Sequence, residues 1–366
     1  MEYKIGRSNQ RQAKDAVNEA VRGFGKPKLI LAFSGVDQFE ECHKELAARF
    51  PDSVVMGAST YVGLCADGAF KNQLLVLAIE DGIDCYADVL EDADKYPLRY
   101  VNRVKQCVNK LGNTQNSVCI EFSSAFLGCE ESVLATLNSV LQGKNIPLLG
   151  GTAGDDCSGK RTFVALNGRV WQNAAVFVLL RNKGGKIHFY RENIYCPTKH
   201  QFVATKVDIE KRIVYEYNRR PAAQCVAEAL NTTVDGLSKY LDSYPMGRLV
   251  GDEMYITANC AVAERQGMMY HARVYNDARM ALLEPRDYKE IVRQTRQQIQ
   301  KDVKGKTLTI MVHCLARSLL FEGDGYLDTF AKETGREIGA YIGFSGYGEQ
   351  LNQQHFNQTM ALAVFE

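Results

Sequence analysis

Three short turns of small and polar residues along this chain could bind a polar ligand. They are VVMGASTYVG (residues 54–63), PLLGGTAGDD (147–156) and AYIGFSGYGEQ (340–350). Glycines allow the backbone to approach a ligand, successive N–H groups can form a nest for an anion, and hydroxyls can recognise a polar head group. Each turn contains Gly-x-(Ser/Thr), which makes two sets of positions equivalent: Gly57, Gly150 and Gly343, and Ser59, Thr152 and Ser345. We therefore expect a small polar molecule to bind where the turns converge.

A second interpretation of these turns is purely structural. Glycine and serine also make tight turns where no ligand binds, so a single copy of the motif carries little weight. Carboxylates follow two of the copies, at Asp155, Asp156 and Glu349. They could pair with a ligand ammonium group or cap backbone amides. Capping is favoured for one of the two aspartates and ligand contact for Glu349.

A basic residue and a thiol precede the third turn in the stretch HCLAR, residues 313–317. The guanidinium of Arg317 could clamp a ligand carboxylate through two hydrogen bonds, or form an ordinary ion pair, and both interpretations stay open. Cys314 stands beside His313, but adjacent residues of a strand point to opposite faces. A buried, inert thiol is therefore favoured over a nucleophile at Cys314.

Each turn belongs to a larger repeat of strand, helix, strand, turn and strand. The strands before the helices are residues 29–34, 118–124 and 308–314, and those after the turns are 74–80, 174–180 and 360–366. Asn167-Gly168 predicts a hairpin, and the periodicity predicts further helices at 8–23, 221–230 and 284–305. A recurring unit of this kind indicates an α/β (α+β) fold with mixed β-sheets covered by helices.

The composition excludes several classes of protein. The 366 residues include 44 Lys and Arg against 43 Asp and Glu, so no net field attracts nucleic acid or an anionic membrane. The eleven cysteines form no CxxC, and the six histidines show no metal-ligand spacing. The N-terminus lacks the apolar core of a signal peptide, and no apolar run approaches the ~20 residues that span a bilayer. We expect a cytoplasmic protein with reduced thiols, no metal site and no membrane insertion.

The ordered motifs resemble those of the FIST domain family, a sensory module of signalling proteins. Residues 57–63 match its GCSTAGE-like turn, and residues 150–156 match its GGxAGDD-like turn. Cys314-x-x-Arg317 and the GFxxYGE-like turn at residues 343–349 follow, and then Asn357-x-Thr359. The resemblance covers residues 28–366. The first turn departs from the pattern at Ala58 and Leu64, where the family often has a cysteine and an acid, so this chain lacks that acid.

The resemblance implies two related halves and a small ligand, with amino acids and related metabolites suggested. We expect an N-terminal lead-in at 1–27, a FIST N-like domain at 28–219 and a FIST C-like domain at 220–366. No catalytic residue or metal site is expected, and the third turn is expected to make most of the specific contacts. The expected ligand-binding residues are Ser59, Thr60, Gly151, Thr152, Gly154, Asp155, Cys314, Arg317, Ser345, Tyr347, Gly348, Glu349 and Asn357.

The chain ends within its last strand, so we expect it to signal to a separate output protein such as a histidine kinase or diguanylate cyclase. Some members of the family resemble haem-based nitric oxide sensors, which makes haem the alternative ligand, with His200, His271, His313 or His355 as its axial residue. Lone histidines are more often packed or solvated. A thiol or serine acyl-transfer enzyme ranks third, because no GxSxG elbow or catalytic triad can be assembled from the sequence.

Overall fold

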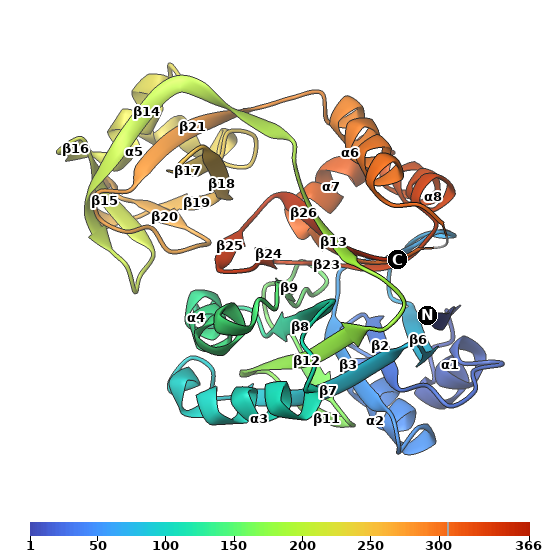
Figure 1. Ribbon diagram of the computed structural model, residues 1–366. Coiled ribbons are helices and arrows are strands. Elements are labelled where there is room, and N and C mark those ends of the chain that lie inside the picture. The colour runs from blue at the N-terminus through green and yellow to red at the C-terminus, as the bar shows by residue number, and fades with distance from the viewer. Residues whose placement is uncertain (306) are drawn as a thin grey trace. The chain divides into compact units, whose positions relative to one another are not determined.

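The computed structural model describes residues 1–305 and 307–366 (Figure 1). It consists of two compact units whose segments alternate along the sequence. The first unit comprises Met1–Arg191, Thr295–Gln353 and Met360–Glu366, and the second comprises Glu192–Gln294 and Gln354–Thr359. The prediction divides the chain into consecutive parts at residue 219, whereas here the third repeat folds with the first two.

The three predicted repeats are present in the first unit. They run β2 (Leu29–Ser34), α2 (Phe39–Arg49), β3 (Val54–Ser59); β8 (Ser117–Ser123), α4 (Glu130–Leu141), β9 (Leu148–Thr152); and β22 (Leu308–Cys314), α7 (Leu315–Gly323), α8 (Leu327–Ile338), β23 (Ala340–Gly346). In each repeat the two strands pair in parallel. The strand after each turn pairs antiparallel with the first strand of its repeat; these strands are β6 (Leu74–Asp81), β12 (Ala174–Asn182) and β26 (Thr359–Phe365). The equivalent glycines occupy equivalent registers, opposite Ala32, Glu121 and Met311.

Each repeat forms the centre of one mixed sheet. The first sheet has the order β1-β6-β2-β3-β10-β11, with β1 (Glu2–Ser8), β10 (Val164–Leu166) and β11 (Arg169–Trp171). The second sheet contains β24-β9-β8-β12-β7, with β24 (Gly348–Leu351) and β7 (Ile83–Glu91). The third has the order β13-β26-β22-β23-β4-β5, with β13 (Ile187–Asn193), β4 (Gly63–Cys65) and β5 (Gly68–Phe70). These mixed sheets confirm the predicted α/β (α+β) class, and the β10–β11 pair confirms the hairpin at Asn167-Gly168.

Helices cover the outer faces of the sheets, and an aromatic core joins their inner faces. Apolar residues of α1 (Ala13–Ala20) and α2 pack on the first sheet, and those of α3 (Val101–Leu111) and α4 pack on the second. Figure 1 shows α7 and α8 beside the third sheet. The ring of Phe344 stacks on Phe33 at 4.8 Å and meets the edge of Phe122 at 5.1 Å. Because side chains alternate along a strand, residues next to these phenylalanines point outward to the helices.

The first helix is shorter than predicted. The sequence predicts helix from Ser8 to Gly23, but residues 2–8 form β1 along β6, and α1 starts only at Ala13. Ser8 therefore ends a strand instead of capping a helix, and its hydroxyl donates to Glu19 Oε2 at 2.6 Å. Pairing with β6 satisfies the backbone of this segment, which overrides its weak helical pattern.

The second unit is one curved antiparallel sheet with a helix against it. Its strands lie in the order β18 (Glu253–Thr257), β17 (Met246–Val250), β21 (Arg279–Pro285), β14 (Tyr195–Asp208), β15 (Ile213–Tyr217), β20 (Met268–Tyr270) and β19 (Asn259–Val262), with β16 (Arg220–Pro221) beside β15. The helix predicted at 221–230 is α5 (Ala222–Ala229), which has Pro221 as its N-cap instead of in its first turn and packs its apolar face on this sheet. Strand β25 (Gln354–Phe356) belongs to the same unit, and α6 (Tyr288–Asp302) follows the predicted pattern.

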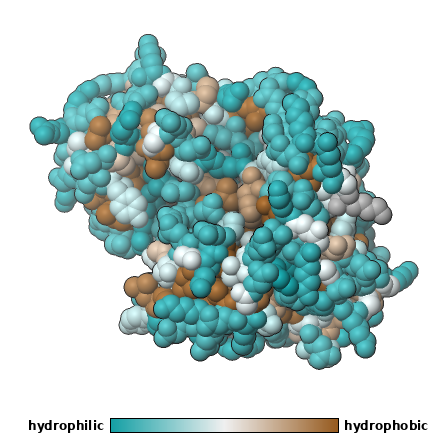
Figure 2. All heavy atoms as spheres, in the orientation of Figure 1, coloured by the Kyte–Doolittle hydropathy of each residue, from teal (hydrophilic) through white to brown (hydrophobic). Residues whose placement is uncertain are grey.

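The visible face of the molecule is mostly polar. Figure 2 shows hydrophilic residues over most of the visible face, with hydrophobic ones in smaller patches. Among the described residues, no helix is both long enough and apolar enough to cross a membrane.

Candidate functional site

The three turns meet at the carboxyl ends of the parallel strands and bond to one another. Gly154 N donates to Ser59 O at 2.8 Å, Tyr61 N donates to Ser345 O at 3.2 Å, and Tyr347 N donates to Thr152 O at 3.0 Å. Each turn is thus hydrogen-bonded to both others. The carboxyl ends of parallel strands are where open α/β sheets most often bind ligands. The predicted convergence of the turns is present in the first unit.

The hydroxyls of the first turn take part in this junction. Ser59 Oγ donates to Gly154 O at 2.7 Å and accepts from Phe163 N at 2.9 Å. Thr60 Oγ1 lies 3.0 Å from Ser345 O and accepts from Ser345 N at 2.9 Å. Both side chains are buried. The hydroxyls of Ser59 and Thr60, which were expected to bind a ligand, therefore hydrogen-bond to the protein backbone.

Close backbone contact explains two of the turn glycines. A Cβ on Gly154 would lie 2.4 Å from Ser345 O, and one on Gly346 would lie 1.9 Å from Thr152 O. Neither distance is possible without moving the backbone. The amides of Gly154, Tyr61 and Tyr347 donate to protein carbonyls, so they hold the turns together rather than forming an anion nest.

Asp155 organises the second turn from within. Its Oδ1 accepts from Cys157 N at 3.0 Å, and its Oδ2 accepts from Lys160 N at 3.1 Å. Tyr347 OH of the third turn donates to the same carboxylate at 2.5 Å, and burial together with this carboxylate raises the pKa of Tyr347. Asp156 Oδ1 accepts from Ser158 N at 3.2 Å. Both aspartates therefore cap backbone amides, and Asp155 also joins the second turn to the third.

Two opposite charges are buried beside the third turn. Glu349 of β24 lies opposite Gly151 of β9, and a Cβ on Gly151 would meet Val312 Cγ1 at 2.5 Å. Directly opposed residues point to one face, so the Glu349 side chain lies on the inner face of the second sheet. Arg317, at the start of α7, is 1% exposed and its guanidinium carbon lies 4.9 Å from the centre of the Phe321 ring. Burial lowers the pKa of Arg317 to about 9, and the charge of Glu349 opposes this shift.

A chain of hydroxyls connects the third turn to a buried imidazole. Ser318 Oγ lies 2.8 Å from both His313 Nδ1 and Ser345 Oγ. Burial lowers the pKa of His313 to about 3, so its ring is neutral at physiological pH and is a weak base. All three side chains are fully buried, and the rings of Phe321 and Phe330 flank the imidazole. Ser318 could not be recognised from the sequence, because its partners lie 5 and 27 positions away.

Burial also distinguishes the cysteines, and this leads to a prediction about thiol chemistry. Cys314 is 3% exposed at the end of β22, whereas Cys157 is exposed. We expect a thiol reagent to label Cys157 first in the folded protein and Cys314 only on unfolding, because the thiolate must reach the reagent. Peptide mass mapping after timed labelling measures this order. Rapid labelling of Cys314 would instead indicate an accessible nucleophile.

The described surroundings of His313 do not fit haem. Its Nδ1 is hydrogen-bonded to Ser318, and the centres of two phenylalanine rings lie 5.2 and 5.6 Å from the imidazole centre. A porphyrin would need the space that these rings fill. The other candidates, His200, His271 and His355, lie in the second unit.

Twelve of the thirteen predicted ligand-binding residues lie in the first unit, most of them in or beside the junction of turns. Thr152 is buried on β9, and Gly348 lies opposite it on β24. Asn357 belongs to the second unit, where its Oδ1 accepts from Ala258 N at 3.3 Å and its N donates to Ile256 O at 3.1 Å.

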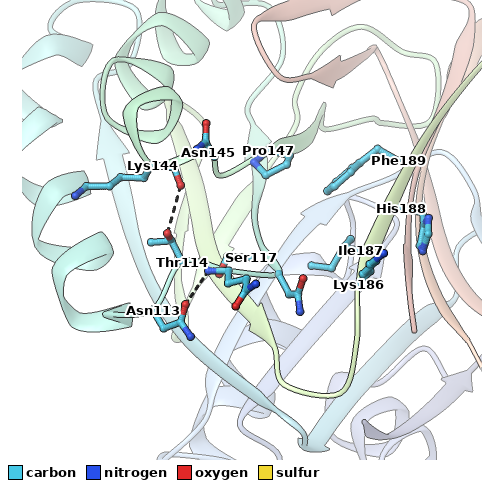
Figure 3. Close-up of a pocket in the computed structure, with 12 residues that line it drawn as sticks. Asn113, Thr114, Ser117, Lys144, Asn145, Pro147, Lys186, Ile187, His188 and Phe189 are labelled. Carbon is cyan, nitrogen blue, oxygen red and sulfur yellow. Dashed lines mark hydrogen bonds between the residues drawn. The ribbon is translucent and has the colours of Figure 1, made fainter.

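A surface hollow lies at the opposite, amino ends of β8 and β9. It has a volume of about 590 Å³ and is lined by residues 113–117, 144–145, 147 and 186–189 (Figure 3). Amide side chains such as Asn113 and Asn145 and the buried hydroxyl of Ser117 line it. These residues could not be recognised from the sequence, because a run such as Asn-Thr-Gln-Asn before a strand is typical of an ordinary loop.

Comparison with known proteins agrees with this architecture. The chain is 25% identical to an uncharacterized protein of Methanocaldococcus jannaschii over 397 aligned positions, which cover 95% of this chain and 75% of that protein. Residues 28–220 match the FIST N domain, and residues 222–352 match the FIST C domain. Since these two matches span nearly the whole chain, the protein belongs to the FIST family.

Proposed function

We propose that this protein is a cytoplasmic sensor that binds a small zwitterionic metabolite, such as an amino acid, beside its third turn. FIST domains are associated with sensory signal transduction. In this proposal Arg317 binds the carboxylate of the ligand and Glu349 binds its ammonium group, while Tyr347 and Ser345 form the adjoining wall. All eleven cysteines are free thiols, which suits a reducing compartment.

Burial of Arg317 and Glu349 is the observation that carries this proposal. Moving a charged side chain out of water costs several kcal/mol, and well-packed apolar residues often stabilise a core as well as a buried ion pair does. Two opposite charges beside interlocked turns therefore suggest a role other than stability. A guanidinium and a carboxylate are also the groups that recognise the two ends of an amino acid.

The output of the sensor is proposed to reside in another protein, such as a histidine kinase or diguanylate cyclase. The support for this step is the association of the family with signal transduction. Ligand binding beside the third turn would change the junction that connects all three repeats, and a partner could detect that change at the surface.

Isothermal titration against a panel of amino acids and related metabolites tests the proposed ligand class. We expect at least one compound to bind, and Glu349→Gln or Arg317→Lys to weaken its affinity by about 10- to 100-fold, since a hydrogen bond to a charged group contributes about 1.5–3 kcal/mol. Glu40→Gln is the matched control, because Glu40 forms an exposed pair with Lys44 on α2. Folded protein that binds no compound, or variants that bind as the parent does, would contradict the proposal.

A further inference from the structure

Another buried carboxyl, that of Glu121, lies on the outer, helix-facing side of the second sheet. It shares this side of β8 with Cys119, which packs in the core under α3 and α4. Ser123 Oγ donates to Glu121 Oε1 at 2.5 Å, and Gln350 Nε2 donates to Ser123 Oγ at 3.3 Å. Glu121 is thus connected through one serine to β24, the strand that carries Glu349 on its other side.

The second carboxyl oxygen of Glu121 and the amide oxygen of Gln350 both lie near Gly150. Glu121 Oε2 and Gln350 Oε1 are buried and have no hydrogen-bond partner among the described residues. Both lie around Gly150, where a Cβ would be 2.6 Å from Glu121 Oε2 and 2.5 Å from Gln350 Oε1. In the other two repeats this place is taken by the ring of His43 and the side chain of Met311. Two acceptor oxygens that border one point require a donor between them.

The charges around Glu121 do not favour its ionised form. Two titratable groups act on Glu121: Glu130 at the start of α4, and the Cys119 thiol on β8. The charge of Glu130 raises the pKa of Glu121. Burial is the largest cause and raises the pKa of Glu121 to about 8. The hydrogen bond from Ser123 acts in the opposite direction but is smaller.

We infer that the Glu121 carboxyl is protonated at neutral pH and that its Oε2 donates a hydrogen bond to Gln350 Oε1. This hydrogen bond holds β24 in place and so positions Glu349 on the opposite face of the sheet. The proton supplies the donor that the two oxygens lack, and it removes the need for a buried cation. Glu121 is a positioning residue in this arrangement, since it acts on the ligand only through β24. The link to ligand binding rests on the proposed function, whereas the proton site itself does not.

The raised pKa of Glu121 makes the folded protein less stable as the pH rises. The folded protein keeps a proton at Glu121 up to about pH 8, whereas an unfolded chain releases it near the ordinary glutamate value of about 4.3. Between these values the folded state binds more protons, so its stability falls as pH rises, by up to about tenfold in the folding equilibrium per pH unit. Above pH 8 the contribution of the proton is lost. The buried His43 and His313 have lowered pKa values, so they change stability only at more acidic pH.

Urea unfolding from pH 6.5 to 9 tests the proton site, with the fluorescence of Trp171, the one tryptophan of the chain, reporting on the first unit. We expect the parent to lose stability across this range and Glu121→Gln, a neutral mimic of the protonated carboxyl, to show a flatter profile. Glu40→Gln should keep the slope of the parent. Hydrogen exchange of residues 348–351 gives a second readout, which should accelerate above pH 8 beyond the intrinsic rate in the parent but not in Glu121→Gln.

Each outcome bears on one of the two ideas. An unchanged slope in Glu121→Gln, or a carboxylate infrared band at pH 7 together with a dependence on potassium or sodium, would overturn the proton site and indicate a bound cation. If the panel of metabolites yields no ligand but the slope is lost in Glu121→Gln, the proton site stands and the proposed function fails. If a ligand is found, its affinity should decline more steeply between pH 7 and 8.5 in the parent than in Glu121→Gln, since the loss of the Arg317 charge near pH 9 affects both proteins.

Discussion

Replacing Arg317 by methionine is expected to destabilise the first unit by about 3–5 kcal/mol. Methionine keeps much of the volume of the side chain but leaves the buried carboxylate of Glu349 without the guanidinium beside it. A carboxylate in that environment must either stay desolvated or take up a proton, and both cost free energy. Urea unfolding at pH 7, followed by Trp171 fluorescence, measures the change.

The double variant Arg317→Met with Glu349→Gln provides the control. Removing both charges eliminates the uncompensated carboxylate, so we expect the double variant to be more stable than Arg317→Met alone. The resulting double-mutant cycle gives the coupling between the two side chains. Equal stability of the single and double variants would show that Glu349 does not depend on Arg317, and the zwitterion site would lose its basis.

Replacing Gly346 by alanine is expected to cost about 3 kcal/mol or more, at the upper end of what overpacking costs. The added Cβ would lie 1.9 Å from Thr152 O, the atom that accepts the hydrogen bond from Tyr347 N. Backbone of the second or third turn must move to admit the methyl group, and the bond between the turns then weakens. Thermal unfolding and hydrogen exchange of residues 343–349 measure the effect.

Gly323→Ala is the matched change at a site without such contact. Gly323 is the last residue of α7, and a Cβ there would meet nothing within 4 Å. Alanine has the higher helix propensity, so we expect a gain of up to about 1 kcal/mol. A Gly346→Ala variant as stable as Gly323→Ala would mean that the turns are not held together as described.

The repeats could be predicted from the sequence because local signals repeat in order. Apolar strands, helical periodicity and small-residue turns recur three times, and Asn167-Gly168 specifies a hairpin by its turn chemistry alone. The first helix was predicted too long because β1 gains its partner, β6, from residues some 70 positions away. Local patterns contain no information on such pairings.

The convergence of the three turns was predicted from the sequence, but the contacts of each residue in them were not. Motif order places Ser59, Thr152 and Ser345 at equivalent turns, and the structure brings these turns together. Whether a hydroxyl faces a ligand or a backbone carbonyl depends on which turn packs against it. Ser59 and Thr60 are engaged by the second and third turns for this reason. The contacts of Ser318 with His313 and Ser345, and of Gln350 with Ser123, join residues of different elements, which no spacing in the sequence indicates.

The family, the three repeats and the α/β class could be predicted without the structure, because they depend on periodicity and on residues close along the chain. The tertiary structure was needed to show that the three turns bond to one another, that Arg317 and Glu349 are both buried, and that Glu121 lies on the opposite face of the second sheet from Glu349. These features arise from cross-strand register and from sheets packed face to face, where a shift of one residue exchanges the two faces of a strand. On β24, for example, the adjacent residues Glu349 and Gln350 point to opposite faces of the sheet, and each belongs to a different proposed site.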